Sequence, residues 1–139
     1  MVESFEVEEP LQFYDAKKDF TTLDAWKKCR EVKLFFYNHI LPLLPASEKY
    51  NLDKQIRSAA VSITANIAEG YGRFHYQEGI QFYRISRGSL YELKDHLMSC
   101  ADLGYVNEEL KSKGMELIED AKISLNGYIK FVQRQMQTK

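Results

Sequence analysis

Apolar residues recur at every third or fourth position in four separate stretches of the chain, and this spacing constrains the fold more than any other sequence feature. Such spacing places apolar side chains on one face of an α-helix. No stretch alternates convincingly with a period of two, which is the pattern of a half-buried strand. The sequence therefore predicts an all-α fold, an up-and-down antiparallel four-helix bundle.

The first predicted helix spans residues 23–41. Thr21 or Thr22 is expected to cap its N-terminus, where a side-chain oxygen satisfies a free backbone N–H group. Pro42 and Pro45 are expected to end it, because proline lacks an amide hydrogen and clashes with the preceding helical turn. The apolar stripe of this helix consists of Leu23, Trp26, Cys29, Val32, Phe36 and Ile40.

The second predicted helix spans residues 47–70, and Ser47 is its expected N-cap. Gly70 and Gly72 indicate its end, since glycine adopts the left-handed conformation that closes many helices. One face of this helix is expected to be buried. Its apolar stripe consists of Leu52, Ile56, Ala59, Ile63 and Ile67.

The third and fourth predicted helices, over residues 76–103 and 108–136, have apolar residues at alternating steps of three and four, as in a heptad repeat. Gly104 is expected to end the third helix, and the fourth starts after Asn107. The third stripe consists of Tyr83, Ser86, Leu90, Leu93, Leu97 and Cys100. The fourth consists of Leu110, Gly114, Leu117, Ala121, Leu125, Tyr128 and Val132.

The net charge of -1 conceals an uneven distribution of charged residues. Residues 1–24 hold seven acidic groups and two basic ones, whereas residues 25–139 hold 17 basic and 13 acidic groups. We therefore expect an acidic N-terminal extension over residues 1–20 and a bundle domain over residues 21–139. Because phosphate binding requires clustered cations, this distribution permits a basic face without requiring one.

The sequence indicates a cytoplasmic protein that does not span a membrane. Its N-terminus is acidic and lacks the cationic and apolar regions of a secretory signal. No stretch approaches the roughly 18 consecutive apolar residues of a transmembrane helix. Cys29 and Cys100 lie far apart and form no CxxC motif, so we expect reduced, buried thiols rather than a disulfide or zinc site.

No motif indicates an enzyme, a metal site or a cofactor. A di-metal bundle needs Glu-x-x-His on two helices, and no glutamate precedes His39, His75 or His96 by three residues. The glycines of residues 70–72 follow a predicted helix and lack the third glycine of a dinucleotide-binding loop. Ser89 lies inside a predicted helix rather than in a GxSxG turn. The sequence therefore predicts a non-enzymatic protein.

A row of polar residues, which we call the polar row, runs beside the apolar stripe of the second predicted helix. Its members are Gln55, Ser58, Ser62, Asn66, Glu69 and Arg73. Polar groups next to a core must be hydrogen-bonded or hydrated, since an unpaired buried group costs about 1–3 kcal/mol. Two interpretations remain: an internal network that fixes the helix register, or a polar surface that faces another subunit or a ligand.

Two segments of the second predicted helix and one of the third carry a recognisable pattern. The second-helix segments read Asp53-x-Gln55-Ile56-Arg57-x-Ala59-Ala60-Val61-Ser62-Ile63 and Asn66-Ile67-Ala68-Glu69-Gly70-Tyr71-Gly72-Arg73. The third-helix segment includes Arg84, Ile85 and Arg87-Gly88-Ser89-Leu90. This pattern resembles the four-helix bundle proteins encoded in intervening sequences of bacterial 23S ribosomal RNA genes, and the likeness covers about residues 20–134.

This resemblance implies a left-handed up-and-down bundle that assembles into a ring, usually a homopentamer. The family is similar to the accessory protein of diversity-generating retroelements, a basic pentamer that works with a reverse transcriptase and nucleic acid. We therefore expect an oligomeric scaffold that binds RNA or a nucleoprotein through an arginine-containing surface. The residues expected to form this surface are Lys54, Arg57, Arg73, Arg84 and Arg87.

The alternative is a structural or protein-docking module that binds no nucleic acid, in which the arginines pair with Glu69, Glu78 or Glu92. Three features depart from the family pattern, one of which is that the body of the chain is only mildly cationic. Gly79 stands where the family usually has a large apolar residue, which predicts a looser start of the third helix. The acidic extension over residues 1–20 is expected to compete with phosphates for a basic face, so its deletion should tighten RNA binding.

Overall fold

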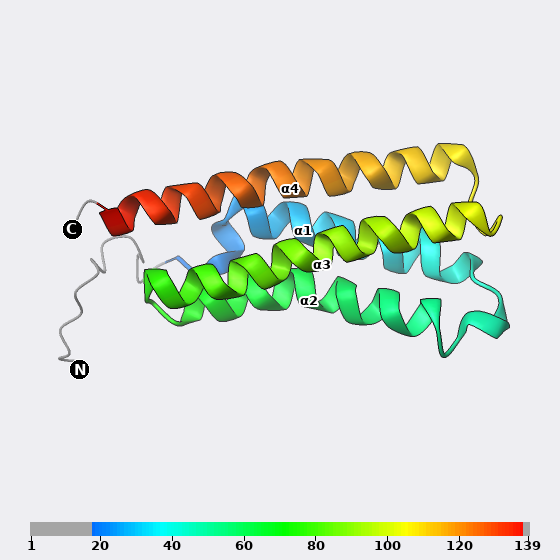
Figure 1. Ribbon diagram of the computed structural model, residues 1–139, viewed down its shortest axis with the longest axis horizontal. Helices are drawn as coiled ribbons and strands as arrows, with labels where there is room; N and C mark the ends of the chain where they lie inside the picture. The colour runs from blue at the N-terminus through cyan, green and yellow to red at the C-terminus, as the bar shows by residue number, and fades with distance from the viewer. Residues whose placement is uncertain (1–17, 138–139) are drawn as a thin grey trace.

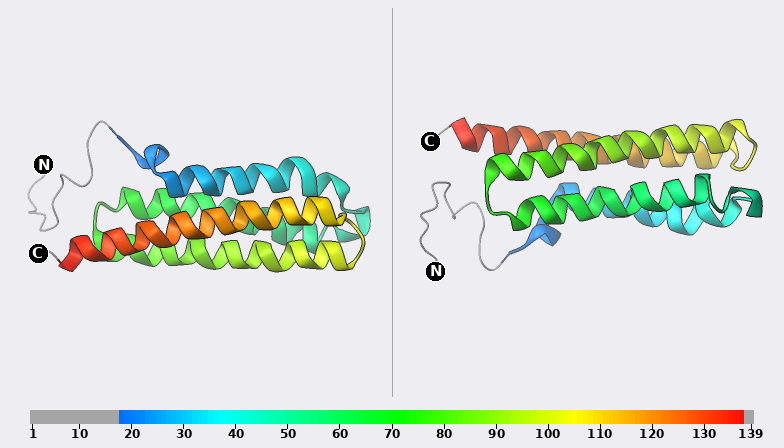
Figure 2. Two further views of the ribbon diagram at one scale, coloured as in Figure 1. Left: turned by 90° about the horizontal axis from the view of Figure 1, so that it is seen from above. Right: turned by 60° about the horizontal axis from the view of Figure 1, so that its bottom comes forward.

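A computed structural model of the chain describes residues 18–137. Four helices run up and down in an antiparallel bundle, and the described residues contain no strand (Figure 1). The helices are α1 (Asp24–Phe35), α2 (Leu52–Gly72), α3 (Tyr76–Asp102) and α4 (Glu108–Gln137). Each helix packs on the next along the chain, and α4 also packs on α1, which closes the bundle (Figure 2). The predicted all-α four-helix bundle is confirmed, while the predicted extension lies almost entirely outside the described residues.

The N-terminus of α1 is not capped by Thr21 or Thr22, so the predicted N-cap is wrong for both residues. Thr21 and Thr22 lie in a short 3-10 turn, η2 (Phe20–Thr22), before the helix. Asp19 closes this turn, because its Oδ1 accepts a hydrogen bond from Thr21 N at 3.0 Å. Leu23 occupies the N-cap position of α1 and contributes no side-chain hydrogen bond.

The chain leaves α1 through three short helical segments. They are the π-helical η3 (Phe36–Ile40) and the 3-10 turns η4 (Leu41–Leu43) and η5 (Ala46–Glu48). The helix predicted over residues 23–41 is therefore α-helical only as far as Phe35. Phe36 and Ile40 are nevertheless fully buried, so η3 extends the apolar face of α1. Pro42 lies in η4, beyond the α-helical hydrogen bonding that it was expected to end.

The second helix begins at Leu52, five positions after the predicted cap Ser47. Ser47 lies in η5 and makes no cap to α2. Instead, Glu48 reaches the first turn of α2, where its Oε1 accepts hydrogen bonds from Leu52 N at 3.4 Å and from Asn51 Nδ2 at 3.1 Å. The prediction for Ser47 is wrong because Glu48, the next residue, has a longer side chain, and this side chain accepts the hydrogen bond from the free amide of Leu52.

Gly70 and Gly79 lie at a close contact between α2 and α3. A Cβ atom on Gly70 would stand 2.9 Å from the carbonyl oxygen of Gly79, and one on Gly79 would stand 3.1 Å from that of Gly70. The left-handed residue after α2 is Phe74, with φ of 51°, and neither Gly70 nor Gly72 adopts a positive φ. Gly70 therefore serves helix packing rather than helix termination, and Gly79 belongs to a tight start of α3 rather than a loose one.

The last two helices follow the prediction more closely. Gly104 ends α3 with φ of 80°, and Asn107 caps α4 by accepting a hydrogen bond from Leu110 N at 2.8 Å. The predicted stripe of α3 is entirely buried. In α4, the buried set includes Ile118 and Ile129, whereas the predicted Leu110, Leu117 and Tyr128 are half-buried. A straight helix drifts about 20° per heptad from a 3.5-residue repeat, and α4 has 30 residues over which this drift accumulates.

The bundle interior is mainly apolar and holds both cysteines as free thiols. Burial raises the pKa of Cys29 to about 12 and that of Cys100 to about 11. Both thiols therefore stay protonated near neutral pH, which makes them weak nucleophiles. None of the helices in residues 18–137 combines the length and apolar character that crossing a membrane requires.

Candidate functional site

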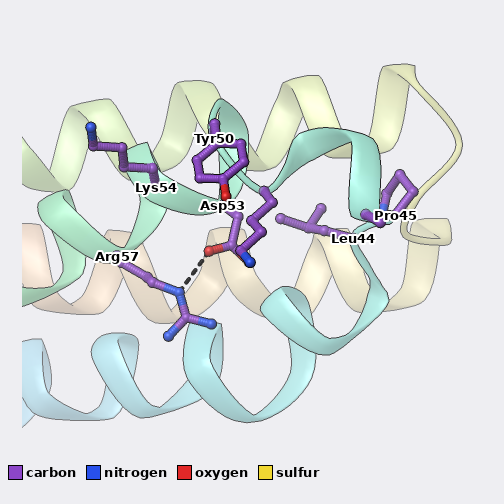
Figure 3. Close-up of a pocket in the computed structure, with 8 residues that line it drawn as sticks. Leu44, Pro45, Tyr50, Asp53, Lys54 and Arg57 are labelled. Atoms are coloured by element: carbon purple, nitrogen blue, oxygen red, sulfur yellow. Dashed lines mark hydrogen bonds and ion pairs between the residues drawn. The ribbon is translucent and has the colours of Figure 1, made fainter.

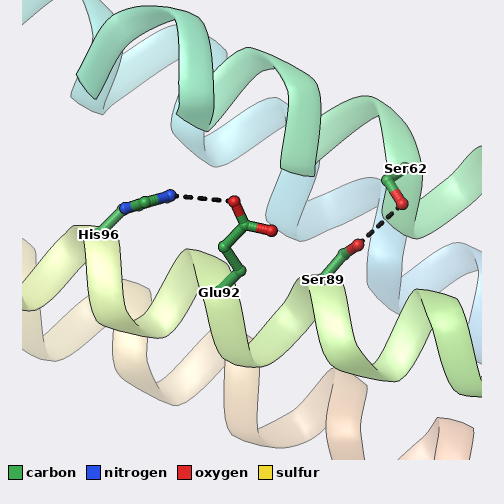
Figure 4. A network of polar contacts seen from close by, with 4 residues as sticks. All are labelled: Ser62, Ser89, Glu92 and His96. Carbon is green, nitrogen blue, oxygen red and sulfur yellow. Dashed lines mark hydrogen bonds and ion pairs between the residues drawn. The ribbon is translucent and has the colours of Figure 1, made fainter. Parts of the chain in front are cut away.

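The middle of the polar row forms hydrogen bonds between α2 and α3 (Figure 4). The hydroxyl oxygens of Ser62 and Ser89 lie 2.8 Å apart, and Asn66 Nδ2 donates to Ser62 Oγ at 2.9 Å. Deeper in the bundle, Ser86 Oγ donates to the carbonyl oxygen of Ile63 at 2.6 Å. These contacts tie the two helices together at one register, as the first interpretation of the row requires.

The ends of the polar row are open to solvent. Gln55 and Ser58 are exposed on α2, and Arg73 Nη2 pairs with Glu69 Oε2 at 3.0 Å, where both side chains are about half exposed. The two ends of the row are therefore exposed, while its middle is hydrogen-bonded between α2 and α3.

The five cations predicted to bind nucleic acid do not share one face of the subunit. Arg57 lies on the α1 side of α2, with its guanidinium 5.4 Å from the ring centre of Tyr37. Arg87 lies on the α4 side of α3 and donates from Nη1 to Asn126 Oδ1 at 2.9 Å. Lys54, near the start of α2, is about 28 Å along the helix axis from Arg73. These cations lie on different sides of the bundle and at different heights along it. Their spacing in the sequence did not reveal this separation.

Three of these cations have intramolecular partners. Asp53 Oδ1 lies 2.6 Å from Arg57 Nε, and this hydrogen bond raises the pKa of the guanidinium. Arg73 pairs with Glu69, as the alternative interpretation predicted. The third, Arg87, bonds a neutral amide rather than a carboxylate. The three arginines therefore already have partners within the subunit.

Lys54 and Arg84 differ from the other three cations. Both are exposed, and within residues 18–137 no carboxylate lies within ion-pair distance of either. Of the two carboxylates on α3 proposed as arginine partners, Glu92 pairs with His96 instead, at 3.2 Å (Figure 4). Lys54 and Arg84 are therefore the predicted cations most available to a phosphate.

An open pocket of about 650 Å³, which we call the α2 pocket, lies where the chain enters α2 (Figure 3). Leu44 and Pro45 lie on one side of it, and Lys54 and Arg57 on the other, with Tyr50 and Asp53 between them (Figure 3). The complete lining consists of Leu44, Pro45, Ala46, Lys49, Tyr50, Asp53, Lys54 and Arg57.

Two residues of the α2 pocket, Lys49 and Tyr50, were missed by sequence reasoning. Tyr50 is 82% exposed, and Lys49 Nζ lies 5.4 Å from the centre of its ring. The sequence does offer a signal. Tyr50 belongs to none of the four apolar stripes, and it stands beside Lys49 in the linker that follows Pro45.

The turn that carries Lys49 and Tyr50 is anchored to the loop between α3 and α4. Tyr105 donates from its hydroxyl to Glu48 Oε2 at 2.7 Å, and this hydrogen bond lowers the pKa of Glu48. Glu48 also accepts from Asn51 and from the first turn of α2. The carboxylate thus joins η5, α2 and the α3–α4 loop.

Replacing Tyr105 by phenylalanine is expected to raise the pKa of Glu48 towards its usual range, because the hydrogen bond that favours the carboxylate is lost. A lowered pKa stabilises the fold above the usual carboxyl pKa, and this contribution disappears as the pH falls through the folded-state value. The stability difference between wild type and Tyr105→Phe should therefore be largest at neutral pH and shrink in acid. Carboxyl NMR titration and urea unfolding at several pH values measure both effects. Tyr50→Phe is the control, and an unchanged Glu48 pKa in Tyr105→Phe contradicts the expectation.

The described residues hold no cluster of three or more histidine, cysteine, aspartate or glutamate side chains placed to bind a metal ion.

Comparison with known proteins gives one family match. The family model described as 23S rRNA-intervening sequence protein matches residues 21–127. The match extends from η2 through most of α4, so it contains the polar row, all five predicted cations and the α2 pocket. No curated protein matches the chain.

Proposed function

The chain belongs to the 23S rRNA-intervening sequence protein family, and from that premise we propose that it is a non-enzymatic oligomeric scaffold that binds RNA. The observation that carries the RNA-binding part is the uneven charge of the bundle. Residues 24–73, which form α1 and α2, hold eight basic and five acidic groups. Residues 76–137, which form α3 and α4, hold eight basic and nine acidic groups. The positive half is the one that carries Lys54 and the α2 pocket.

Assembly is proposed because a single subunit offers few available cations. Several copies on one scaffold would present the same positive half repeatedly, and multivalent contact strengthens weak binding at each subunit. Exposed apolar side chains on the α2–α3 side support such assembly. Val61 on α2 and Ile85 on α3 are each 50% exposed, and apolar side chains at the surface gain stability when another subunit buries them.

Two measurements test the proposal. The mass in solution, with and without co-purified nucleic acid, should correspond to several 16.3 kDa chains. Filter binding of a structured RNA at low and moderate salt should show affinity that falls as salt increases, because phosphate contacts release counterions. A single-chain mass contradicts the scaffold, and affinity that is absent or indifferent to salt contradicts RNA binding through cations.

The second candidate is a structural or protein-docking module without nucleic-acid binding, and the intramolecular partners of Arg57, Arg73 and Arg87 favour it. Charge reversal separates the two candidates. Arg87→Glu should disturb the α3–α4 contact with Asn126, whereas the matched Arg84→Glu should leave the fold unchanged. If both variants bind RNA as the wild type does, and Arg87→Glu loses the assembled state, the docking module is favoured.

A further inference from the structure

We propose that the α2 pocket binds one nucleotide of a single-stranded RNA, with the base stacked on Tyr50 and the phosphate between Lys49 and Lys54. This inference rests on the proposed RNA-binding function and gives that function a specific site. Three features of the pocket support this assignment: the exposure of Tyr50, the charge of the pocket walls and the anchoring of the turn.

Tyr50 offers a ring face to a ligand. It is 82% exposed, the largest exposed fraction among the large hydrophobic side chains of the described residues. It packs into neither the core nor the set of half-buried residues around the core. A nucleobase has a flat face of similar size, and base stacking on aromatic side chains tolerates any sequence. Leu44 and Pro45 add apolar surface to the same pocket.

The walls of the α2 pocket are cationic. Three basic side chains, Lys49, Lys54 and Arg57, line it with one acidic side chain, Asp53. Asp53 is occupied by Arg57 at 2.6 Å, while no described carboxylate pairs with Lys54. Among the described residues neither Lys49 nor Lys54 has a carboxylate partner, so both can meet a phosphate without first breaking an ion pair there.

The pocket is held in shape before any ligand binds. Glu48, next to Lys49 in the chain, is fixed by Tyr105 at 2.7 Å and by Asn51 at 3.1 Å. On the opposite wall, Arg57 is held between Asp53 and the ring of Tyr37. A preformed site loses little conformational entropy when it binds, so more of the stacking and phosphate interactions appear as affinity.

The first experiment measures fluorescence anisotropy of a labelled oligouridylate with the full chain at low salt. Tyr50→Ala should weaken binding about 5- to 100-fold, the usual effect of removing one stacking ring. Tyr50→Phe keeps the ring and should bind as the wild type does. Tyr91→Ala is the matched control, because Tyr91 is also an exposed tyrosine but lies on α3, outside the pocket.

The second experiment uses the salt dependence of the same binding. Lys54→Ala should reduce the slope of log affinity against log salt by about 0.7, the value for one phosphate contact on a single strand. Lys113→Ala on α4 is the control for a lysine outside the α2 pocket. Uridine 5′-monophosphate added to the wild type should also shift the NMR signals of the Tyr50 ring.

The outcomes separate this inference from the proposed function. If the full chain binds the oligonucleotide and neither Tyr50→Ala nor Lys54→Ala changes its affinity or salt slope, the pocket assignment is overturned while RNA binding stands. If the full chain does not bind the oligonucleotide and filter binding with structured RNA also fails, both are overturned. If Tyr50→Ala changes the mass in solution but not the affinity, the α2 pocket is a protein contact and the assignment is again overturned.

Discussion

Replacing Gly70 by alanine is expected to lower the free energy of unfolding by about 1–3 kcal/mol, the usual cost of overpacking a close contact. The added Cβ would lie 2.9 Å from the carbonyl oxygen of Gly79 and 2.7 Å from Cε1 of Tyr83. The carbonyl belongs to the backbone of α3, so it cannot rotate away, and the two helices would have to separate locally. The expected loss is the net effect, after the gain of about 1 kcal/mol that alanine brings as the better helix former.

A graded series of glycine substitutions makes this prediction specific. Gly79→Ala should cost less than Gly70→Ala, since its Cβ would be 3.1 Å from the carbonyl oxygen of Gly70. Gly88→Ala, in the middle of α3 with no atom within 4 Å of the new Cβ, should stabilise the protein by about 0.5–1 kcal/mol. Urea unfolding at one fixed protein concentration measures all three, because assembly would make stability depend on concentration. Equal effects for Gly70→Ala and Gly88→Ala would show that α2 and α3 are not in close contact at Gly70.

The sequence was sufficient for the helices because their apolar spacing is a local property. All five predicted stripe residues of α2 are buried, from Leu52 to Ile67, and so is the complete predicted stripe of α3. The role of Gly70 was misjudged because a glycine at the end of a helix has the same local sequence whether it terminates the helix or admits a neighbour. Only the position of Gly79 on another helix decides between the two.

The candidate site was less predictable because, like the contact between Gly70 and Gly79, it depends on residues that are far apart in the chain. The anchor of the α2 pocket joins Glu48 to Tyr105, which lies 57 positions away in the chain. Lys54 and Arg57 were identified as cations, but the sequence did not show that Lys49 and Tyr50 complete a pocket with them. Pocket formation depends on how a linker folds back on a helix, and linkers lack the periodic pattern that makes helices recognisable.

Replacing Ile85 by aspartate is expected to convert the proposed assembly into single 16.3 kDa chains. Ile85 lies one helical turn before Ser89, which bonds to Ser62 on α2, so its side chain borders the α2–α3 contact. The exposed side of α2 next to Ser62 carries small residues, among them Ser58 and Ala65, and small side chains allow another helix to approach closely. A carboxylate buried in such a contact without a partner costs several kcal/mol, enough to abolish a moderate interface.

The fold itself should tolerate Ile85→Asp, because half of the Ile85 side chain is already exposed within one subunit. Circular dichroism should show unchanged helix content while the mass in solution falls. Ile123→Asp is the matched control: Ile123 is 62% exposed on α4, away from the α2–α3 contact, and its replacement should leave the assembly intact. If Ile123→Asp dissociates the assembly and Ile85→Asp does not, the subunits meet through α4 instead. The positive α1–α2 half would then lie opposite the contact, which changes how many copies of the α2 pocket one RNA strand can reach.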